Sequence, residues 1–476
     1  MFHSKMTATS IRDTLRYAKK GKNILFVGIC GVGMSALARM LHQRGYGILG
    51  YDKEKGGEYA RLRREKIPVF HSCEQIDLSS VCLIVYTLAI EDHHPLIRHE
   101  IPECSRAQLL GAMMLDYHIR IAVSGAHGKS TVTSLLHRAL LSLGEEPTTL
   151  SGADLGDGDG PLYIGKTRIF LYECCEYKNS FLYTFPTHAL VLNIDLDHTD
   201  FFPSLDALKH AFLTFMHKAQ TVLYFQNDCD IPDGNERLPD GAIGYTLKQS
   251  HTQKHDTVPY LATVDKKTQD RYTYSFYLNG VRCATLTPML SGLVGVYNTL
   301  ASLVLLTHLG YDPHRCAQIL ETLSPIARRM EFLGMLSERA VYYDFAHHPT
   351  EIRASLVQLT ERYGTPPTVI FAPHTYTRTR DFWDGFVDAF SLAHTVCLAP
   401  IYPAREMPIP GVTSERLAQA IGRHAYPLRD LEDTLKYLEC GEGPIVLLGA
   451  GNLTEIKEKI TKMKIFVSKS SQKLEQ

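Results

Sequence analysis

The 476-residue sequence has no excess of charge of either sign, because 50 lysines and arginines balance 51 aspartates and glutamates. This balance gives no electrostatic basis for nucleic acid or an anionic membrane as the main partner. No stretch approaches the roughly 18 apolar residues of a membrane-spanning helix, and the first residues contain no apolar segment of signal-peptide length. We therefore expect a cytoplasmic protein without membrane insertion.

Cysteines are few and follow no ligand spacing. The sequence contains 11 of them, scattered without the paired spacing of a zinc site. The adjacent Cys174 and Cys175 suit neither an ordinary disulfide nor a zinc knuckle. Reduced thiols, as in a cytosolic enzyme, are the better interpretation.

Short apolar runs that alternate with helical patterns predict parallel sheets with crossover helices. A helix is expected over residues 34–44, and the last dozen residues are expected to form a frayed tail. The expected strands are 23–28, 47–52, 81–87, 119–124, 169–172, 189–194, 340–344, 368–371, 395–399 and 444–449.

This pattern restarts twice along the chain, near residues 119 and 340. We expect an α/β protein with three domains, since domains of this class usually hold about 100–200 residues. They are a Rossmann-like N-terminal domain over 1–118, a central P-loop ATPase-type parallel-sheet domain over 119–324, and a C-terminal Rossmann-like domain over 325–476.

A glycine-rich turn follows the first expected strand. Gly31, Gly33 and Ala36 fit the pattern G-x-G-x-x-A, and Asp52 ends the next strand. Such glycines let a diphosphate approach a helix N-terminus, and such an acid can hold a ribose. Taken alone, the turn fits an NAD-type cofactor, another diphosphate ligand such as a UDP-sugar, or a purely structural turn.

A phosphate loop follows the strand at 119–124. The residues from Gly125 to Thr131 read GAHGKST, which ends like a P-loop but has a shorter glycine spacing. Backbone amides and Lys129 can surround phosphates, and the Ser130 hydroxyl can reach Mg²⁺. A chance turn is the alternative, and the strand–turn–helix context argues against it.

Polar side chains follow two further strands. One segment runs from Leu171 to Glu176 and the other from Asn193 to Asp200. Because the carboxyl ends of parallel strands face the ligand crevice, both segments should point toward the phosphate loop. Carboxylates and histidines there can hold magnesium and its phosphate ligands.

These motifs, with others in the last third of the chain, resemble the Mur ligase family. The further motifs are YDFAHHPT over 343–350, PHTYTRTRD over 373–381, YPAREMPI over 402–409 and GAGN over 449–452. They occur in order across most of the chain. The resemblance implies an ATP-dependent, amide-forming ligase of peptidoglycan synthesis that uses Mg²⁺.

The same resemblance implies the substrates. L-Alanine would join the lactyl carboxylate of UDP-N-acetylmuramate through an acyl phosphate, as in the member that adds the first amino acid of the cell-wall peptide. The alternative within the family is a recycling ligase that adds a preformed tripeptide. We expect a monomer or a weak homodimer.

The resemblance also implies roles for individual residues. Catalysis is expected from Lys129, Glu176, His198 and His348, and metal binding from Ser130, Glu176 and His198. The UDP-sugar would contact Gly28, Gly31, Gly33, Met34, Ser35, Asp52, His71 and Thr87. ATP would contact Gly125, Ala126, His127, Gly128, Lys129, Ser130, Thr131, Asn298, Arg329 and Asp344. The amino acid would contact His374, Arg378 and Arg380.

The sequence departs from the family pattern at several of these sites. Cys30 and Cys175 replace a usual glycine and aspartate, and Thr375 replaces an arginine. Residues 291–295 read SGLVG where P-G-x-H-N is usual. These departures leave the choice among L-alanine, L-serine and glycine open, because one methyl group changes binding by only about 1–3 kcal/mol.

Two hypotheses outside the family remain. An NAD-dependent oxidoreductase would use the first glycine turn but would leave the phosphate loop without a purpose. A nucleotide-sensing protein without catalysis would use the loop but no amino acid.

Overall fold

The structure is a computed structural model of the chain. It describes residues 6–88, 90, 94–97, 100–156, 160–229, 237–249, 258–404, 406–428, 442–450, 453 and 456–458. The expected frayed tail lies outside the described residues, as do Gly451 and Asn452 of the last motif. No helix in the described part of the chain combines the length and apolar character needed to cross a membrane.

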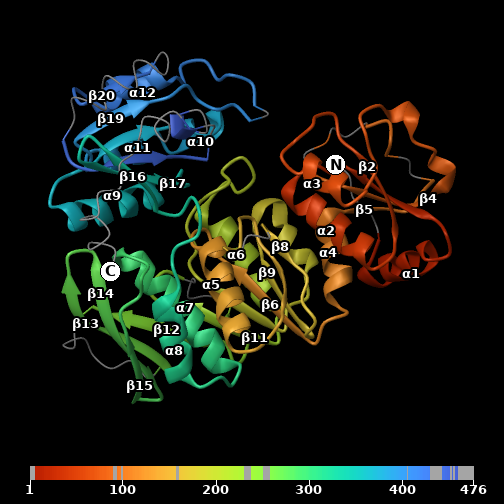
Figure 1. Cartoon of the computed structure of the whole chain (residues 1–476), viewed down its shortest axis with the longest axis horizontal. Helices are drawn as coiled ribbons and strands as arrows, with labels where there is room; N and C mark the ends of the chain where they lie inside the picture. Colours follow the sequence, from red (N-terminus) through yellow and green to blue (C-terminus); the bar gives the residue numbers. More distant parts are fainter. Residues whose placement is uncertain are drawn as a thin grey trace. The chain divides into compact units, whose positions relative to one another are not determined.

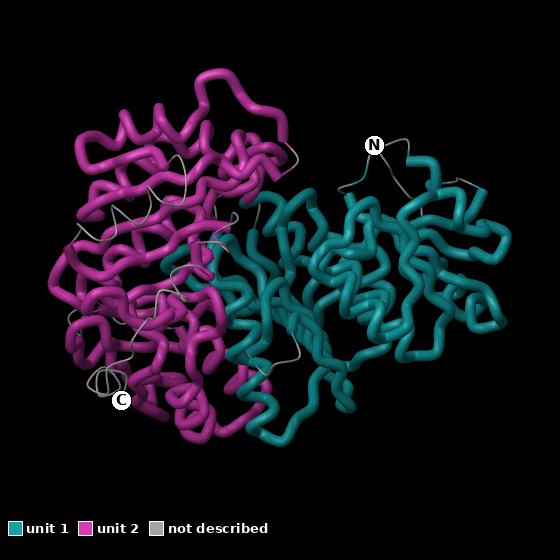
Figure 2. The backbone as a smooth tube through the Cα atoms, turned by 45° about the horizontal axis from the view of Figure 1, so that its top comes forward, with its two compact units in different colours: residues 1–194, 209–243 teal, residues 195–208, 244–476 magenta. Residues whose placement is uncertain are grey.

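The chain divides into two compact units, drawn in teal and magenta in Figure 2. Unit 1 comprises residues 1–194 and 209–243, and unit 2 comprises residues 195–208 and 244–476.

Unit 1 begins with a parallel sheet of order β3-β2-β1-β4-β5 (Figure 1). The chain changes direction across the sheet between β1 and β4, which is where open α/β sheets bind ligands beyond their strand ends. The elements are α1 Ala8–Ala18, β1 Asn23–Val27, α2 Val32–Gln43, β2 Gly47–Tyr51, α3 Tyr59–Arg64, β3 Val69–Phe70, η1 Cys73–Gln75, η2 Leu78–Ser80, β4 Val81–Tyr86, β5 Glu103–Ser105 and α4 Arg106–Met114.

The later strands of unit 1 follow the order β11-β10-β6-β9-β7-β8. Their pairs are parallel except for β7 and β8. The elements are β6 Ile119–Ser124, α5 Lys129–Ser142, β7 Thr148–Leu150, β8 Leu162–Tyr163, β9 Ile169–Glu173, η3 Tyr177–Tyr183, β10 His188–Val191 and β11 Thr221–Phe225. The helix α6 Leu205–Met216 contains residues of both units.

Unit 2 contains strands in the order β15-β14-β13-β12, of which β12 and β13 are parallel and the others antiparallel. Two helices, α7 and α8, follow them. The elements are β12 Ile243–Lys248, β13 Tyr260–Thr268, β14 Arg271–Leu278, β15 Val281–Leu286, α7 Gly292–His308 and α8 Pro313–Thr322.

A second sheet of unit 2 has the order β16-β17-β21-β18-β19-β20, parallel except for β16 with β17 (Figure 1). The elements are β16 Glu331–Leu336, β17 Arg339–Asp344, α9 Pro349–Tyr363, β18 Thr368–Phe371, α10 Tyr376–Asp381, α11 Trp383–Phe390, β19 Thr395–Leu398, α12 Ser414–Ile421, β20 Ala425–Pro427 and β21 Ile445–Leu448.

The central strands of this last sheet are buried on both faces. Val369 and Phe371 pack in one cluster with Leu356 of α9. Ile370, which lies between them in sequence, belongs to a second cluster with Leu447 of β21. Alternate residues of a strand point to opposite faces, so an unbroken apolar run is typical of a parallel strand covered on both sides.

The strands expected from sequence are confirmed, each to within a few residues, and so is the helix expected over residues 34–44, which is α2. The N-terminal helix α1 was not predicted, and neither were strands β3, β5, β7, β8, β11 to β16 and β20, of which β13 to β15 form antiparallel pairs. The carboxyl ends of β1, β6 and β9 carry the glycine turn, the phosphate loop and the acidic segment of unit 1.

Gly111 marks a close approach within unit 1. A Cβ at this position of α4 would lie 2.0 Å from the backbone oxygen of Tyr183, at the end of η3. Alanine is favoured over glycine inside a helix by about 1 kcal/mol, but overpacking against fixed backbone costs about 1–3 kcal/mol. We expect Gly111→Ala to lower the melting temperature.

Gly57 provides the control for this measurement. A Cβ there meets no atom within 4 Å, so Gly57→Ala should leave the melting temperature unchanged. Equal melting temperatures for the two variants would contradict the close packing of α4 on η3.

Candidate active site

The turn after β1 gathers residues expected to bind the UDP-sugar. Gly28 has a φ of +85°, and a Cβ there would lie 2.6 Å from Cγ2 of Thr87. The Asp52 carboxylate accepts a hydrogen bond of 2.8 Å from the Cys30 N–H. His71 Nδ1 lies 2.8 Å from the Asp52 carbonyl oxygen. The Asp52 carboxylate therefore closes the turn. Four of the residues expected to bind the UDP-sugar lie together at the turn: Gly28, Asp52, His71 and Thr87.

A guanidinium lies at the start of the next helix. Gly31 is the N-cap of α2, and a Cβ at Gly33 would lie 3.1 Å from Nη1 of Arg106. Helix N-termini and arginines both attract phosphate. Arg106 could not be predicted from the sequence, because a single arginine at the start of an apolar helix matches no motif.

Three side chains of this turn point into the protein. Met34 and Ser35 are buried, and the Ser35 hydroxyl donates a hydrogen bond of 2.9 Å to Glu58. Cys30 is also buried, and burial together with Asp52 raises the pKa of its thiol to about 11. The Cys30 side chain thus leaves the space before the turn open.

The phosphate loop is held by an ion pair between Lys129 and Glu176. The Lys129 Nζ lies 3.2 Å from Glu176 Oε2 and also donates to the carbonyl oxygens of Gly125 and Ala126. Burial alone would lower the pKa of Lys129, but the attraction of Glu176 outweighs it and the pKa is raised. The ammonium therefore stays charged.

A second carboxylate lies beside the loop. The Ser130 hydroxyl donates a hydrogen bond of 2.9 Å to Glu173 Oε2, which also accepts one of 2.7 Å from the Gly152 N–H. Burial and then Glu176 raise the pKa of the Cys175 thiol to about 12. Cys175 is therefore neutral near pH 7, so the carboxylates Glu173 and Glu176 supply the negative charge on this side of the loop.

The middle of the loop is bonded to the segment that follows β10. The His127 N–H donates to Asn193 Oδ1 at 2.9 Å, and Asn193 Nδ2 donates back to the His127 carbonyl oxygen at 3.1 Å. Gly125 and Gly128 have φ of +141° and +84°, which favours glycine. Thr131 is buried at the start of α5. Asn193 and Glu173 lie inside motifs noted in the sequence but were not selected there.

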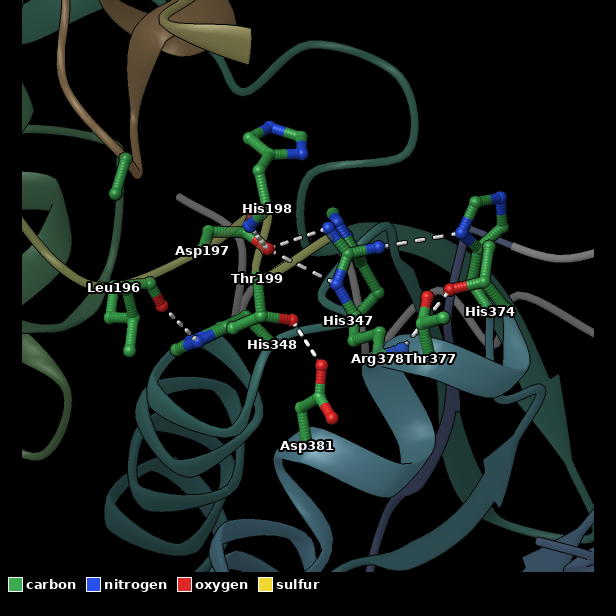
Figure 3. Close-up of polar contacts among 12 residues, drawn as sticks. Leu196, Asp197, His198, Thr199, His347, His348, His374, Thr377, Arg378 and Asp381 are labelled. Atoms are coloured by element: carbon green, nitrogen blue, oxygen red, sulfur yellow. Dashed lines mark hydrogen bonds and ion pairs between the residues drawn. The ribbon is translucent and has the colours of Figure 1, made fainter. Parts of the chain in front are cut away.

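In unit 2, the Asp197 carboxylate contacts the side chain of Arg378 and the backbone of His198 (Figure 3). Its Oδ1 accepts a hydrogen bond of 2.7 Å from Nη2 of Arg378 and another of 2.7 Å from the His198 N–H. On its other side, the Arg378 guanidinium lies 3.4 Å from His374 Nδ1. Burial would raise the pKa of Asp197, but Arg378 outweighs it and lowers the pKa.

The two consecutive histidines begin α9. His348 is the N-cap of this helix, and its Nδ1 accepts from the Thr350 N–H. Its Nε2 lies 3.1 Å from the Leu196 carbonyl oxygen, as Figure 3 shows. Burial lowers the pKa of His347 to about 4 and also lowers the pKa of His374. Both imidazoles are therefore neutral near pH 7.

Asp344 ends β17 and lies close to the start of α9. Its carboxylate accepts a hydrogen bond of 2.6 Å from the Ser355 hydroxyl, and burial raises its pKa. Arg329 lies 3.9 Å from Glu351 on α9. Asn298 is buried on α7. The structure therefore places Arg329 and Asp344 in one neighbourhood, and Asn298 on a separate helix.

Arg380 does not join Arg378. Its Nε donates a hydrogen bond of 2.6 Å to Asp381, and its side chain is 53% exposed. Residues two apart on a helix point in nearly opposite directions. Thr375 caps α10 by accepting from the Arg378 N–H, and the Thr377 N–H donates to Glu406 at 2.9 Å. The 402–409 segment thus anchors the helix that carries Arg378.

Three family models match the chain in order. They are the catalytic domain of the Mur ligase family at residues 23–118, the Mur ligase middle domain at 123–306, and the glutamate ligase domain of Mur ligases at 328–452.

Curated proteins named UDP-N-acetylmuramate–L-alanine ligase align with most of the chain. The one from Agathobacter rectalis is 32% identical over 92% of this chain and 98% of its own length. The one from Lachnospira eligens is 33% identical, with the same coverage of both chains.

Solved structures share the fold. UDP-N-acetylmuramate–alanine ligase from Thermotoga maritima superposes with a TM-score of 0.74 at 24% identity, covering 93% of this chain and 98% of that one. A murein peptide ligase from Psychrobacter arcticus gives 0.67 at 19% identity, covering 94% and 100%. The expected three-domain α/β fold is confirmed, while its exact boundaries stay a prediction. The chain belongs to the Mur ligase family.

Proposed function

We propose that this protein is an ATP-dependent ligase that joins L-alanine to the lactyl carboxylate of UDP-N-acetylmuramate. The observation that carries the proposal is the phosphate loop, in which Lys129 is held beside Glu176, in a chain whose curated relatives with that activity align over 92% of its length. Membership of the family favours a UDP-sugar over a nicotinamide cofactor at the first glycine turn.

The first step activates the carboxylate, which is a poor electrophile. A carboxylate oxygen attacks the γ-phosphorus of ATP, the bond from that phosphorus to the β-phosphate oxygen breaks, and ADP leaves. Lys129 and the amides of the loop stabilise the charge on the transferred group. The product of this step is an acyl phosphate.

The second step forms the amide. The amine of L-alanine attacks the acyl carbon, the carbon–oxygen bond to phosphate breaks, and inorganic phosphate leaves as the amine loses its proton. Arg378, whose fork suits a carboxylate, would hold the carboxylate of the amino acid. The neutral His347 and His374 do not repel its ammonium group.

The donor set of the loop fits Mg²⁺. The Ser130 hydroxyl and the carboxylates of Glu173 and Glu176 offer the hard oxygen ligands that this ion prefers, and the family resemblance implies His198 as a further ligand. A bound ion would neutralise the negative charge of the phosphates. Lys129 would add a further positive charge beside the phosphates.

The proposal is tested by phosphate release from purified protein with ATP, Mg²⁺ and UDP-N-acetylmuramate. We expect turnover with L-alanine in preference to L-serine, glycine and the tripeptide, and a product heavier by one alanyl residue. Turnover with the tripeptide alone would instead identify a recycling ligase. No turnover with any amine would overturn the proposal and make Cys30, Cys175 and Thr375 signs of another activity.

Lys129→Ala should reduce kcat/KM by about 100-fold or more, which is the usual effect of removing one donor that stabilises transition-state charge. Lys166→Ala is the matched control, because Lys166 forms an exposed pair with Glu146 in the same unit. Both variants should give the circular dichroism of the parent protein. If Lys129→Ala retained its activity, the loop would have no role in phosphoryl transfer.

Arg378→Lys should raise the KM for the amino acid about tenfold or more, since a hydrogen bond to a charged group contributes about 1.5–3 kcal/mol. The KM values for ATP and the UDP-sugar should change little. Arg380→Lys, on the exposed face of the same helix, should leave all three constants within a factor of about 2. Equal effects of the two substitutions would show that the guanidinium of Arg378 does not bind the amino acid.

A further inference from the structure

Arg362, in the last turn of α9, bonds to three separate elements of unit 2. Its Nε donates to Asp270 Oδ2 at 2.8 Å, in the turn between β13 and β14. Its Nη2 donates to the Ser291 hydroxyl at 2.8 Å, and its Nη1 donates to the Tyr342 hydroxyl at 2.7 Å. Each arm of the guanidinium therefore has a partner.

Ser291 is the N-cap of α7 and stands where the family usually has proline. Next to it, the Gly292 N–H donates to the Asp270 carbonyl oxygen at 2.7 Å. A Cβ at Gly292 would lie 3.1 Å from the Gln358 side chain of α9. The start of α7 is thus in direct contact with both the turn at Asp270 and helix α9.

The same segment lacks the His-Asn pair of the family pattern and has Val294 and Gly295 instead. A Cβ at Gly295 would lie 2.1 Å from the Leu290 carbonyl oxygen. An asparagine therefore cannot occupy this position without a shift of the backbone. The start of α7 is organised by other residues in this chain, among them the ion pair of Arg362 and Asp270.

The pair of Arg362 and Asp270 is largely withdrawn from water, with side-chain exposures of 26% and 3%. Burial alone would lower the pKa of Arg362, but Tyr342 and Asp270 outweigh it and raise the pKa. A buried pair of this kind fixes geometry strongly, because removing one partner leaves an uncompensated charge.

Helix α9 connects this network to the site residues. His348 caps its first turn, and Arg362 lies in its last turn. Asn298, one of the expected ATP contacts, lies on α7, and Arg362 donates a hydrogen bond to the N-cap residue of that helix. One guanidinium thus joins the helix that begins with His348 to the helix that carries Asn298.

We propose that Arg362 is a positioning residue for the nucleotide: through Ser291 and Asp270 it fixes the start of α7 against α9. The inference rests on the proposed function for its nucleotide, MgATP. Arg362 touches no reacting atom, so its effect should appear in nucleotide affinity and not in the recognition of the sugar or the amino acid.

A neighbouring ion pair provides a control within the same interface. Lys267 Nζ of β13 lies 2.6 Å from Glu361 on α9, and Glu361 also accepts from the Tyr272 hydroxyl. This pair joins α9 to the β13–β14 hairpin, whereas Arg362 in addition bonds to the cap of α7. Glu361→Gln therefore weakens the interface without removing the contact to Ser291.

The test is the dissociation constant of MgATP, measured by calorimetry without the other substrates. Ser291→Ala removes the acceptor hydroxyl and leaves the ion pair intact. The double variant Arg362→Gln with Asp270→Asn replaces both partners of the ion pair by neutral side chains. It removes the charged hydrogen bond to Ser291 and leaves no unpaired buried charge. Both should weaken MgATP binding about tenfold, the effect of losing a hydrogen bond to a charged group, while Arg362→Lys should recover part of the affinity.

The kinetic constants complete the test. The KM for ATP should rise in Ser291→Ala and in the double variant, with the KM values for the UDP-sugar and the amino acid unchanged. Glu361→Gln should keep the MgATP affinity of the parent. If the variants lost only melting temperature and kept their MgATP affinity, Arg362 would be structural and the inference would be overturned.

The outcome is separable from that of the proposed function. A parent protein that binds MgATP but forms no amide would contradict the ligase assignment and leave the binding test of Arg362 valid. A parent protein that does not bind MgATP would overturn both.

Discussion

The ion pair between Lys129 and Glu176 is the constraint on which the phosphate loop depends. Moving either charge out of water without a partner would cost several kcal/mol of free energy. The two residues must therefore come from elements that end side by side. Strands β6 and β9, which pair in parallel, meet this requirement. Because β10 pairs with β6 on its other edge, Asn193 then reaches the backbone of His127. The parallel order of three strands thus decides which polar groups meet around the loop.

An ion pair also organises the site in unit 2, where an arginine takes the place of the lysine and an aspartate that of the glutamate. The Asp197 carboxylate binds the Arg378 guanidinium, and the partly buried, neutral imidazoles of His347 and His374 lie next to the pair. The cluster therefore has little net charge before any ligand arrives. An amino acid, which carries one charge of each sign, matches such a neutral and strongly polarised environment better than a simple anion would. Thr375 stands where the family usually has an arginine, and in this chain it is the N-cap of α10.

Much of the fold could be predicted because parallel strands buried on both faces appear as apolar runs, and glycine turns mark their carboxyl ends. The strands β13 to β15 were missed, although the Asn279-Gly280 pair, with φ of +49° and +81°, is a strong hairpin signal. Arg106, Asp197 and Glu406 were missed for another reason. Their partners lie far away in sequence, and only the folded chain brings Arg106 to Gly33 or Glu406 to Thr377. Arg380 is the reverse case: its motif position predicts a contact with the amino acid, its side chain is exposed and turned away from Arg378, and its role stays a prediction.

Helix α9 has 15 residues and is therefore about 22 Å long, at a rise of about 1.5 Å per residue. Because the helix is rigid and Arg362 fixes its C-terminal end, a small change of angle there moves its N-terminal end. A tilt of about 3° at Arg362 displaces the opposite end by about 1 Å, a shift that can reduce the rate of a reaction about 100-fold when it misplaces reacting groups. Substitutions on the distant β13–β14 turn can thus act on His348 without touching it, and sequence changes that tune this ligase need not lie in any of its recognisable motifs.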